Sequence, residues 1–279
     1  MINRGEIDRV VSMALEEDIG AGDLTSRATI PADLSLVATV HARQSMVLAG
    51  LPLAEATFKA CDPGCDFASE VQDGARLEAG AVIARVTGNA RSILTAERTA
   101  LNILQHLSGI ATLTRTYADR IAHTTAKLLD TRKTIPGLRT LAKYAVRMGG
   151  GHNHRMRLDD GVLIKDNHIA RVGSVQAAIE AARAIDTSAS TIGITVECDT
   201  LDQVRGAIAA GADRLLLDNM TLDQLRTAVE MTAGRIPLEA SGGVTLETIA
   251  AIAETGVDYI SVGRITQSAP AVDIGLDYG

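Results

Sequence analysis

The sequence predicts an α/β protein whose C-terminal half forms an open, incomplete parallel α/β barrel. In that half, six short apolar runs alternate with stretches of helical spacing, which is the pattern of βαβ units around a parallel sheet. Six strands fall short of the eight in a closed (β/α)8 barrel, so an open barrel is expected. With 279 residues, of which 46% are hydrophobic, the chain can build a barrel and a smaller companion domain.

The N-terminal half has a different pattern. Residues 6–17 place their apolar side chains on one helical face, and residues 35–91 have the texture of short strands and turns. Within that stretch, residues 71–83 predict two short strands joined through glycine turns. A long helix is predicted over residues 95–120, where leucines recur at helical spacing.

The C-terminal half shows a regular alternation of elements. Its strands are predicted at residues 127–130, 162–165, 192–197, 214–218, 237–240 and 259–263. The intervening helices are predicted at residues 174–185, 201–210, 221–233 and 245–255. This order places the carboxyl ends of all the strands at one mouth of the barrel, where parallel barrels have their active sites.

Nearly every predicted strand ends in a reactive side chain. A single polar residue there would only mark where a strand meets a loop, but six strand ends in succession predict a catalytic mouth. These strand-end residues are Asp130 to Lys133, Lys165 with Asp166, Glu197, Asp218 with Asn219, Glu239 to Ser241, and Gly263 with Arg264.

Basic residues are concentrated in one part of an acidic chain. The net charge is −7, yet the segment from residue 127 to residue 165 holds nine basic and only three acidic residues. A cationic pocket in an acidic protein predicts a small ligand with several negative charges. Arg139, Lys143 and Arg147 recur at helical spacing and fit a solvated helix face, whereas the basic residues at strand ends do not.

Three glycine-bearing segments are candidate anion sites. Ser241-Gly242-Gly243 and Val262-Gly263-Arg264 follow late strands, where main-chain N–H groups often hold a phosphate. Residues 149–155 combine three glycines with His-Asn-His-Arg. A metal site there would use His152 and His154, with His168 as a further candidate, but His-x-His lacks a clear third ligand and its neighbours are cationic, so anion binding is favoured.

Composition excludes several other classes of protein. The negative net charge and the 2% content of aromatic residues argue against a nucleic-acid-binding protein. The three cysteines lack zinc-site spacing, which favours reduced thiols. No apolar run approaches the roughly twenty residues of a membrane span, and the first residues lack a signal core. We therefore expect a soluble, cytoplasmic protein that binds neither nucleic acid nor membrane.

Many short motifs resemble those of the quinolinate phosphoribosyltransferase family. The resemblance runs nearly end to end, and no position that we expect to be catalytic departs from it. The motifs are Glu17-Asp18, Gly22–Thr25, Glu97–Asn102, Leu107–Thr112, Asp130–Arg139, Gly149–Arg155, Ile164–Ile169, Val196-Glu197, Leu217–Asn219, Glu239–Gly243 and Ser261–Gly263.

The resemblance implies a fold and an assembly. An α/β sandwich domain would span residues 1–110 and be completed by the C-terminal tail, residues 266–279. The open barrel would span residues 111–265. It also implies a homodimer, in which Arg98 acts in the active site of the neighbouring subunit.

The resemblance also implies the reaction, which converts quinolinate and phosphoribosyl pyrophosphate into nicotinate mononucleotide, pyrophosphate and carbon dioxide, a step of NAD biosynthesis. Lys133, Lys165, Glu197 and Asp218 would be the catalytic residues, and the last two would also hold Mg²⁺, largely through the substrate. Quinolinate would be bound by Arg98, Arg132, Lys133, His154 and Arg155. Phosphoribosyl pyrophosphate would be bound by Lys165, Glu197, Asp218, Ser241, Gly242, Gly243, Gly263 and Arg264.

Three alternatives remain open at this point. A phosphoribosyltransferase of the same fold could act on nicotinate or another base. A non-catalytic relative associated with molybdenum transport should lack part of the basic set, and this sequence has it complete. A phosphate-binding isomerase or aldolase could use Lys165 as a Schiff base, but it leaves Arg98, Arg132 and Arg155 unexplained.

Overall fold

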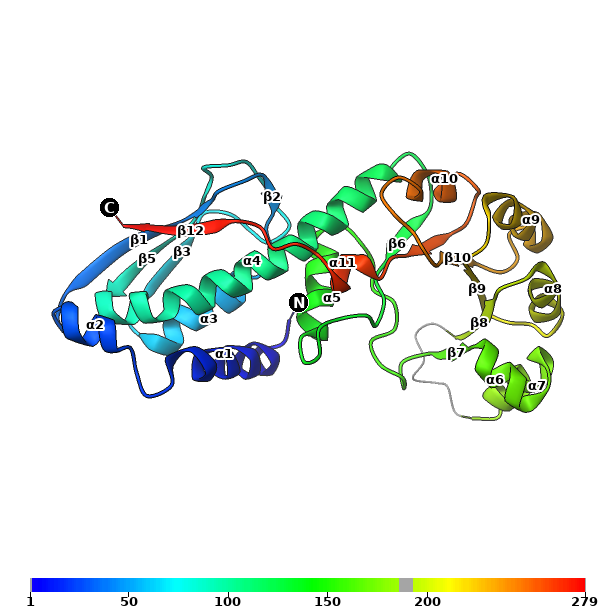
Figure 1. The fold of residues 1–279 in the computed structure, drawn as a ribbon, viewed down its shortest axis with the longest axis horizontal. Coiled ribbons are helices and arrows are strands. Elements are labelled where there is room, and N and C mark those ends of the chain that lie inside the picture. The colour runs from blue at the N-terminus through cyan, green and yellow to red at the C-terminus, as the bar shows by residue number, and fades with distance from the viewer. Residues whose placement is uncertain (1, 186–192, 279) are drawn as a thin grey trace. The chain divides into compact units, whose positions relative to one another are not determined.

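The computed structural model describes residues 2–185 and 193–278, and the chain divides into two compact units (Figure 1). The N-terminal unit comprises residues 1–115, 135–150 and 268–279, and the barrel unit comprises residues 116–134 and 151–267. The predicted boundary at residue 110 stays a prediction. The C-terminal tail and the segment 135–150 both belong to the N-terminal unit.

The N-terminal unit is built on a four-stranded antiparallel sheet in the order β12-β1-β5-β3. Its strands are β1 (Ser35–Ala42), β3 (Asp66–Ser69), β5 (Val82–Asn89) and β12 (Ile274–Tyr278), beside the separate pair β2 (Met46–Val47) and β4 (Arg76–Leu77). Its helices are α1 (Arg4–Ile19), α2 (Leu24–Thr29), α3 (Leu51–Cys61), α5 (Arg139–Met148) and most of α4 (Ala90–Arg120).

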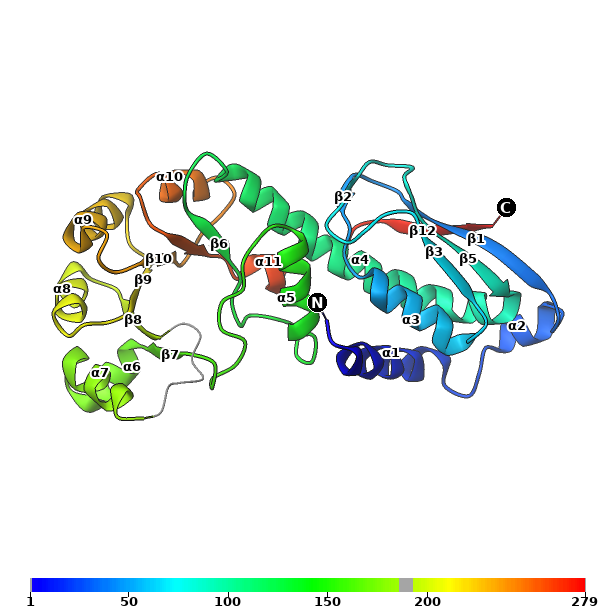
Figure 2. The ribbon, with the colours of Figure 1, turned by 180° about the vertical axis from the view of Figure 1, so that it is seen from behind.

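Helices α3 and α4 share one apolar core with this sheet. Phe58 of α3 and Leu101 of α4 are buried together with Val40 and Val86 of the sheet. Helix α1 packs on α3 (Figure 2) and buries the apolar face that was predicted for residues 6–17. The predicted long helix is also confirmed, and it begins earlier than expected, at Ala90.

Helix α3 corrects the sequence-based expectation, which gave only strands and turns for residues 35–91. The helix begins after Gly50, which adopts a positive φ of 113°. Asp73 accepts hydrogen bonds from the main-chain N–H groups of Gly50 (2.9 Å) and Leu51 (3.1 Å), so its carboxylate satisfies donors at the start of the helix. These contacts come from a distant part of the sequence, so no local pattern signals them.

The glycine turns predicted within residues 71–83 are present. Gly74 and Gly80 both have positive φ angles, and β4 and the start of β5 lie there. The two strands do not pair with each other, however. Strand β4 pairs with β2, whereas β5 lies between β1 and β3.

The barrel unit contains one parallel sheet in the order β6-β11-β10-β9-β8-β7, which confirms an open, six-stranded arrangement in the part of the chain described. The strands are β6 (Lys127–Leu129), β7 (Val162–Ile164), β8 (Ile194–Cys198), β9 (Arg214–Asp218), β10 (Leu238–Ser241) and β11 (Tyr259–Ser261). Of the predicted third strand, Ile192 lies outside the described residues. The helices are α6 (Asp166–Val172), α7 (Val175–Arg183), α8 (Leu201–Ala209), α9 (Leu222–Thr232), α10 (Ile249–Ala253) and α11 (Arg264–Gln267).

The two faces of this curved sheet differ in character. Helices α7 to α10 lie around its outside (Figure 1), over apolar side chains such as Leu215, Leu238 and Ile260. Because side chains alternate along a strand, the residues between them face the interior of the barrel. In register, Glu239 of β10 lies beside Tyr259 of β11, so polar side chains occupy the inner face.

Helix α5 forms as its spacing predicts, but the interpretation of its basic residues as a solvated face is wrong at Lys143. Arg147 is exposed, whereas Lys143 is only 1% exposed. All residues from 141 to 146 are buried, so this helix has little solvated face. Hydrophobic spacing alone does not predict such a helix, because a buried charge interrupts the pattern. No helix among the described residues combines the length and the apolar character needed to cross a bilayer.

The glycines after α5 make close contacts. A Cβ atom on Gly149 would lie 2.4 Å from the Ala111 carbonyl oxygen and 2.6 Å from Thr114 Cβ. In contrast, a Cβ atom on Gly206, within helix α8, would meet no described atom within 4 Å. One glycine is therefore required by packing, whereas the other only weakens its helix.

We expect Gly149→Ala to lower the free energy of unfolding by about 1–3 kcal/mol, because the added methyl group forces packed main chain apart. The matched control Gly206→Ala should raise the free energy of unfolding by about 0.5–1 kcal/mol through higher helix propensity. Urea unfolding followed by circular dichroism measures both. Equal effects of the two substitutions would contradict the packing described here.

Candidate active site

Apart from Arg98, every side chain predicted for the site belongs to the barrel unit. These residues follow the carboxyl ends of the strands or lie in the segment beside β6. They are Arg132, Lys133, His154, Arg155, Lys165, Glu197, Asp218, Ser241, Gly242, Gly243, Gly263 and Arg264. Because the six strands are parallel, their carboxyl ends lie at the same end of the barrel, which places the predicted site residues there.

Residues 152–154 run beside β6 in the manner of an additional strand. The main-chain N–H of His152 donates to the Leu128 carbonyl (2.8 Å), and the N–H of Asp130 donates to the His152 carbonyl (3.1 Å). This pairing carries His154 and Arg155 to the end of β6 that Arg132 and Lys133 follow. It joins two motifs that are separate in the sequence.

Asp130 holds this segment from one side. Its fully buried carboxylate accepts hydrogen bonds from His154 N (2.9 Å) and from Asn153 Nδ2 (2.6 Å). A buried carboxylate that accepts such donors fixes their position, since any movement would leave a buried charge poorly paired. Asp130 and Asn153 are thus structural parts of the site that the sequence did not identify as such.

Arg155 is the most deeply buried arginine of the predicted site. It is 8% exposed, and its Nη1 donates to the Gly161 carbonyl at 2.7 Å. Burial, and then the positive charge of Arg132, lower the pKa of Arg155 below its usual value, while Asp160 acts in the opposite direction. A bound anion would relieve both the burial of the Arg155 charge and the repulsion by Arg132.

Lys133 lies against the loop that follows β11. A Cβ atom on Gly263 would be 2.8 Å from Lys133 Cδ, so the lysine side chain passes over this glycine. The main chain of Lys133 is fixed at both ends, because its N–H donates to Thr131 Oγ1 (3.0 Å) and its carbonyl accepts from Thr266 Oγ1 (2.8 Å). The structure thus brings a predicted catalytic lysine to a predicted phosphate loop.

Lys165 and Glu197 form an ion pair across neighbouring strands. Lys165 Nζ lies 2.7 Å from Glu197 Oε2, and the lysine side chain remains 45% exposed while the glutamate side chain is largely covered. On the next strand, Asp218 accepts a hydrogen bond from Asn219 Nδ2 (2.6 Å). Two carboxylates and one ammonium group are therefore held at the ends of β7, β8 and β9.

The loop after β10 requires glycine. Gly242 has a φ of 91°, and a Cβ atom there would lie 2.2 Å from Asn219 Oδ1. Gly243 has a φ of 60°, and a Cβ atom there would meet no described atom within 4 Å. Gly242 thus allows close approach to Asn219, whereas Gly243 faces open space in which a ligand could lie.

The described residues contain no group of three or more histidine, cysteine or acidic side chains that could hold a metal ion by themselves. The reading of His152 and His154 as metal ligands therefore lacks a third protein ligand among them. Glu197 and Asp218 are two oxygen donors on adjacent strands. They fit an ion that completes its coordination with ligand oxygens, as Mg²⁺ commonly does.

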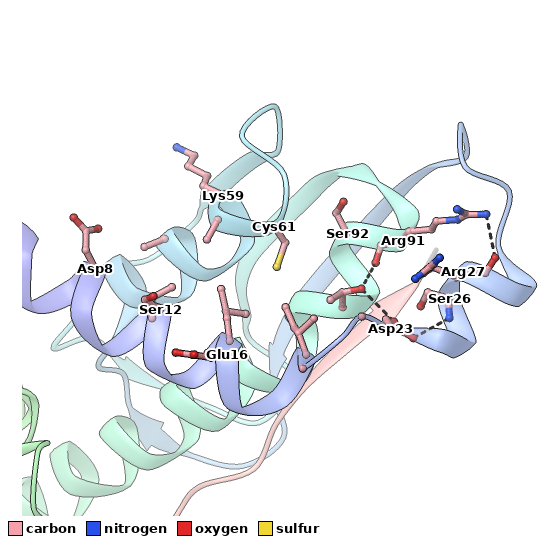
Figure 3. Close-up of a pocket in the computed structure, with 18 of the residues that line it drawn as sticks. Asp8, Ser12, Glu16, Asp23, Ser26, Arg27, Lys59, Cys61, Arg91 and Ser92 are labelled. Carbon is pink, nitrogen blue, oxygen red and sulfur yellow. Dashed lines mark hydrogen bonds between the residues drawn. The ribbon is translucent and has the colours of Figure 1, made fainter.

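Two cavities lie in the N-terminal unit and contain one predicted site residue between them. A cavity of about 780 Å³ is lined by α1, α2, α3 and α4 and by side chains of both charges (Figure 3). In it, Asp23 caps helix α2 by accepting from Ser26 N (2.9 Å). A smaller cavity of about 200 Å³ is lined by Arg98, Asp18 and Asp23, with Arg98 exposed on α4.

Glu239 is the charged residue whose place sequence reasoning least anticipated. It was grouped with residues that end a strand, but it lies inside β10 and is fully buried. A carboxylate within an otherwise apolar strand was the signal that could have identified it, since charged residues are almost never fully buried without a partner.

Comparisons with known proteins indicate the same family over nearly the whole chain. Sequence profiles described as the N-terminal and C-terminal domains of quinolinate phosphoribosyl transferase match residues 23–108 and 110–277. A Mycobacterium leprae protein named nicotinate-nucleotide pyrophosphorylase (carboxylating) is 45% identical over 96% of this chain and 95% of its own length. A Bacillus subtilis protein with that name, marked probable, is 43% identical over 99% of this chain and 94% of its own length. The structure of the nicotinate-nucleotide pyrophosphorylase from Francisella tularensis matches with a TM-score of 0.96 and 41% identity, covering 100% of this chain and 98% of that one.

We expect Asp130→Asn to lower the free energy of unfolding by about 1–3 kcal/mol, because an amide cannot accept from both His154 N and Asn153 Nδ2 without turning a donor toward one of them. The melting temperature should fall by about 2–4 °C for each kcal/mol. Calorimetry measures the shift, with Asp223→Asn as the control, since Asp223 forms only an exposed pair with Arg226. An unchanged melting temperature for Asp130→Asn would show that Asp130 does not hold the segment.

Proposed function

This chain belongs to the quinolinate phosphoribosyltransferase family, and we propose from that premise that it catalyses the reaction named for its relatives. The reaction transfers a phosphoribosyl group from phosphoribosyl pyrophosphate to quinolinate and releases carbon dioxide. The products are nicotinate mononucleotide and pyrophosphate. The chain would thereby supply a nucleotide for NAD biosynthesis.

The observation that carries this proposal is the pairing of residue 152 with β6, which brings His154 and the buried Arg155 to the strand end that Arg132 and Lys133 follow. Cationic groups gathered at one strand end are stabilised by a ligand with two negative charges. Quinolinate offers two adjacent carboxylates, and each can accept two parallel hydrogen bonds from a guanidinium fork. Lys133 and His154 would complete this half of the site.

The other half of the proposed site suits phosphoribosyl pyrophosphate. Lys165 would meet pyrophosphate oxygens, and the loops of Ser241 to Gly243 and of Gly263 with Arg264 would hold the 5′-phosphate. The open space at Gly243 and the position of Lys133 over Gly263 support this placement. Glu197 and Asp218 lie between the two halves and would hold the ribose hydroxyls.

Mg²⁺ would be held by Glu197 and Asp218 together with oxygens of the pyrophosphate. Bound there, it would neutralise charge on the leaving group. Two carboxylates, with no third protein ligand among the residues that the structure describes, fit an ion that arrives with its substrate.

The mechanism needs positioning more than protein acid–base chemistry. The pyridine nitrogen of quinolinate attacks the anomeric carbon as the bond to pyrophosphate breaks, and the carboxylates of Glu197 and Asp218 stabilise positive charge that develops on the ribose. The alkylated ring nitrogen is then positively charged. It stabilises the carbanion left when the adjacent carboxylate departs as carbon dioxide, and a proton takes that place. Holding both substrates in line is the main catalytic task.

The assembly and the location are further parts of the proposal. A homodimer would let the exposed Arg98 of one subunit act on quinolinate in the site of the other. The three cysteines, Cys61, Cys65 and Cys198, are free thiols in the structure, which supports a cytoplasmic protein.

The direct test is to incubate the purified protein with quinolinate, phosphoribosyl pyrophosphate and Mg²⁺ and to measure nicotinate mononucleotide and carbon dioxide. A parallel reaction contains nicotinate in place of quinolinate. Equal amounts of nucleotide and gas from quinolinate alone are expected. Product from nicotinate, or no product from folded protein that still binds the phosphoribosyl donor, would refute the proposal.

Arg155→Lys should raise the KM for quinolinate by about 10-fold or more, because lysine keeps the charge but loses the planar fork and the contact with Gly161. The KM for phosphoribosyl pyrophosphate should stay within about twofold. The control is Arg157→Lys, a nearby exposed arginine that pairs only with Asp159 among the described interactions, and it should change neither constant. Steady-state kinetics give both values, and a matching rise in the two KM values would argue against a quinolinate role.

Removal of Mg²⁺ with EDTA should abolish turnover, and added Mg²⁺ should restore it. Quinolinate binding, measured by calorimetry without the phosphoribosyl donor, should change by less than about twofold, because the proposed ion bridges to phosphate oxygens. If quinolinate affinity fell together with activity, the ion would belong to the quinolinate half of the site.

A further inference from the structure

A buried charged network lies on the inner face of the barrel sheet and reaches His154 of the predicted quinolinate site. Glu239 is fully buried on the inner face of β10, and its Oε2 lies 3.3 Å from His154 Nε2 and 3.5 Å from Arg214 Nη1. The Arg214 guanidinium in turn lies over the ring of Tyr259, 4.2 Å from its centre. The mechanism above uses none of Glu239, Arg214 and Tyr259.

The Glu239 carboxyl is ionised at neutral pH. Burial raises its pKa, but the hydrogen bond with His154 and the positive charge of Arg214 outweigh burial and lower the pKa below its usual value. An ionised carboxylate can accept hydrogen bonds but cannot donate them. A nitrogen atom that faces the Glu239 carboxylate must therefore carry a hydrogen to form a hydrogen bond with it.

The other ring nitrogen of His154 is occupied by the main chain. The N–H of Arg155 donates to His154 Nδ1 at 2.7 Å, so Nδ1 carries no proton. The ring proton of the neutral imidazole is then on Nε2, which faces Glu239. The carboxylate selects this tautomer, as a second partner commonly does for a functional histidine.

We propose that Glu239 is a positioning residue of the quinolinate site, which acts through His154 on the main chain of Arg155. Asp130 accepts hydrogen bonds from residues 153 and 154, and Glu239 faces Nε2 of the His154 ring. The guanidinium of Arg155 is thereby kept at its place beside Arg132. This inference rests on the proposed function, in which Arg155 binds quinolinate.

A neighbouring cavity explains why the ring needs such a partner. His154 borders a cavity of about 310 Å³ that is also lined by Lys127, His152, Arg214 and Tyr259. The ring is therefore not enclosed by packed side chains on every side, and its polar contacts contribute to its orientation. An ion pair between Glu239 and Arg214 would by itself add little net stability, because desolvation of two buried charges offsets their attraction.

Glu239→Gln tests the proposal with little change of shape. An amide can donate as well as accept, so it admits the other tautomer, whose Nδ1–H would repel the N–H of Arg155. The Kd for quinolinate, measured by calorimetry on the intact protein, should rise by about fivefold to tenfold, while the KM for phosphoribosyl pyrophosphate stays within about twofold. Imidazole ¹⁵N shifts of His154, assigned by comparison with His154→Asn, should lose their single Nε2–H signature.

A double-mutant cycle separates this route from a purely structural one. In His154→Asn, the asparagine Oδ1 can still accept from Arg155 N but cannot reach Glu239. Glu239→Gln should then change the quinolinate Kd by less than about twofold in the His154→Asn background. Thr195→Val, which alters another buried polar residue of the barrel interior, is the control and should leave the Kd unchanged.

Three results would overturn the inference. They are an unchanged Kd in Glu239→Gln, an equal weakening of both substrates, and an effect of Glu239→Gln that persists in full without His154. Failure of the wild-type protein to bind quinolinate would instead reject the proposed function, so the two failures are distinguishable.

Discussion

The candidate site depends on two buried carboxylates that both contact one short segment, residues 153–154. Asp130 accepts from the main chain and side chain of residues 153–154, and Glu239 faces the His154 ring. Ionised carboxylates are costly to bury, and here Asp130 accepts from two donors of the segment, whereas Glu239 faces one, His154 Nε2. These contacts fix the position of the segment and therefore of Arg155, which follows it. The positive charge of Arg132 acts on the buried Arg155 and lowers its pKa together with burial.

The half of the site proposed for phosphate is organised by a different constraint, which is steric. Gly242 lets the loop after β10 approach Asn219, and Gly263 lets Lys133 cross the loop after β11. Rigid loops at strand ends and pre-paired side chains such as Lys165 with Glu197 limit the reorganisation that substrate binding must induce. The half proposed for quinolinate is therefore positioned by buried charges, and the half proposed for phosphate is positioned by glycines that permit close contacts.

The parts of this structure that were predictable from sequence are those with a local signal. Apolar runs located the six barrel strands, and the polar residues at their ends define most of the candidate site, because a parallel sheet brings strand ends together. Helix α3 escaped prediction because its capping carboxylate, Asp73, comes from elsewhere in the chain. The burial of Lys143 and of Glu239 was not predicted, because it depends on residues that are distant in the sequence and surround these side chains only in the folded protein. The pairing of His152 with Leu129 likewise depends on a contact across the fold.

The place of β12 has a consequence for how the chain is made. This strand forms from residues 274–278, close to the end of the sequence, yet it pairs along β1, which forms from residues 35–42. During synthesis, β1 emerges long before its partner and has an unpaired edge until the whole barrel has been translated. The N-terminal sheet is thus completed last although it begins first. A ribosome that stalls or terminates early would release a sheet whose open edge favours aggregation.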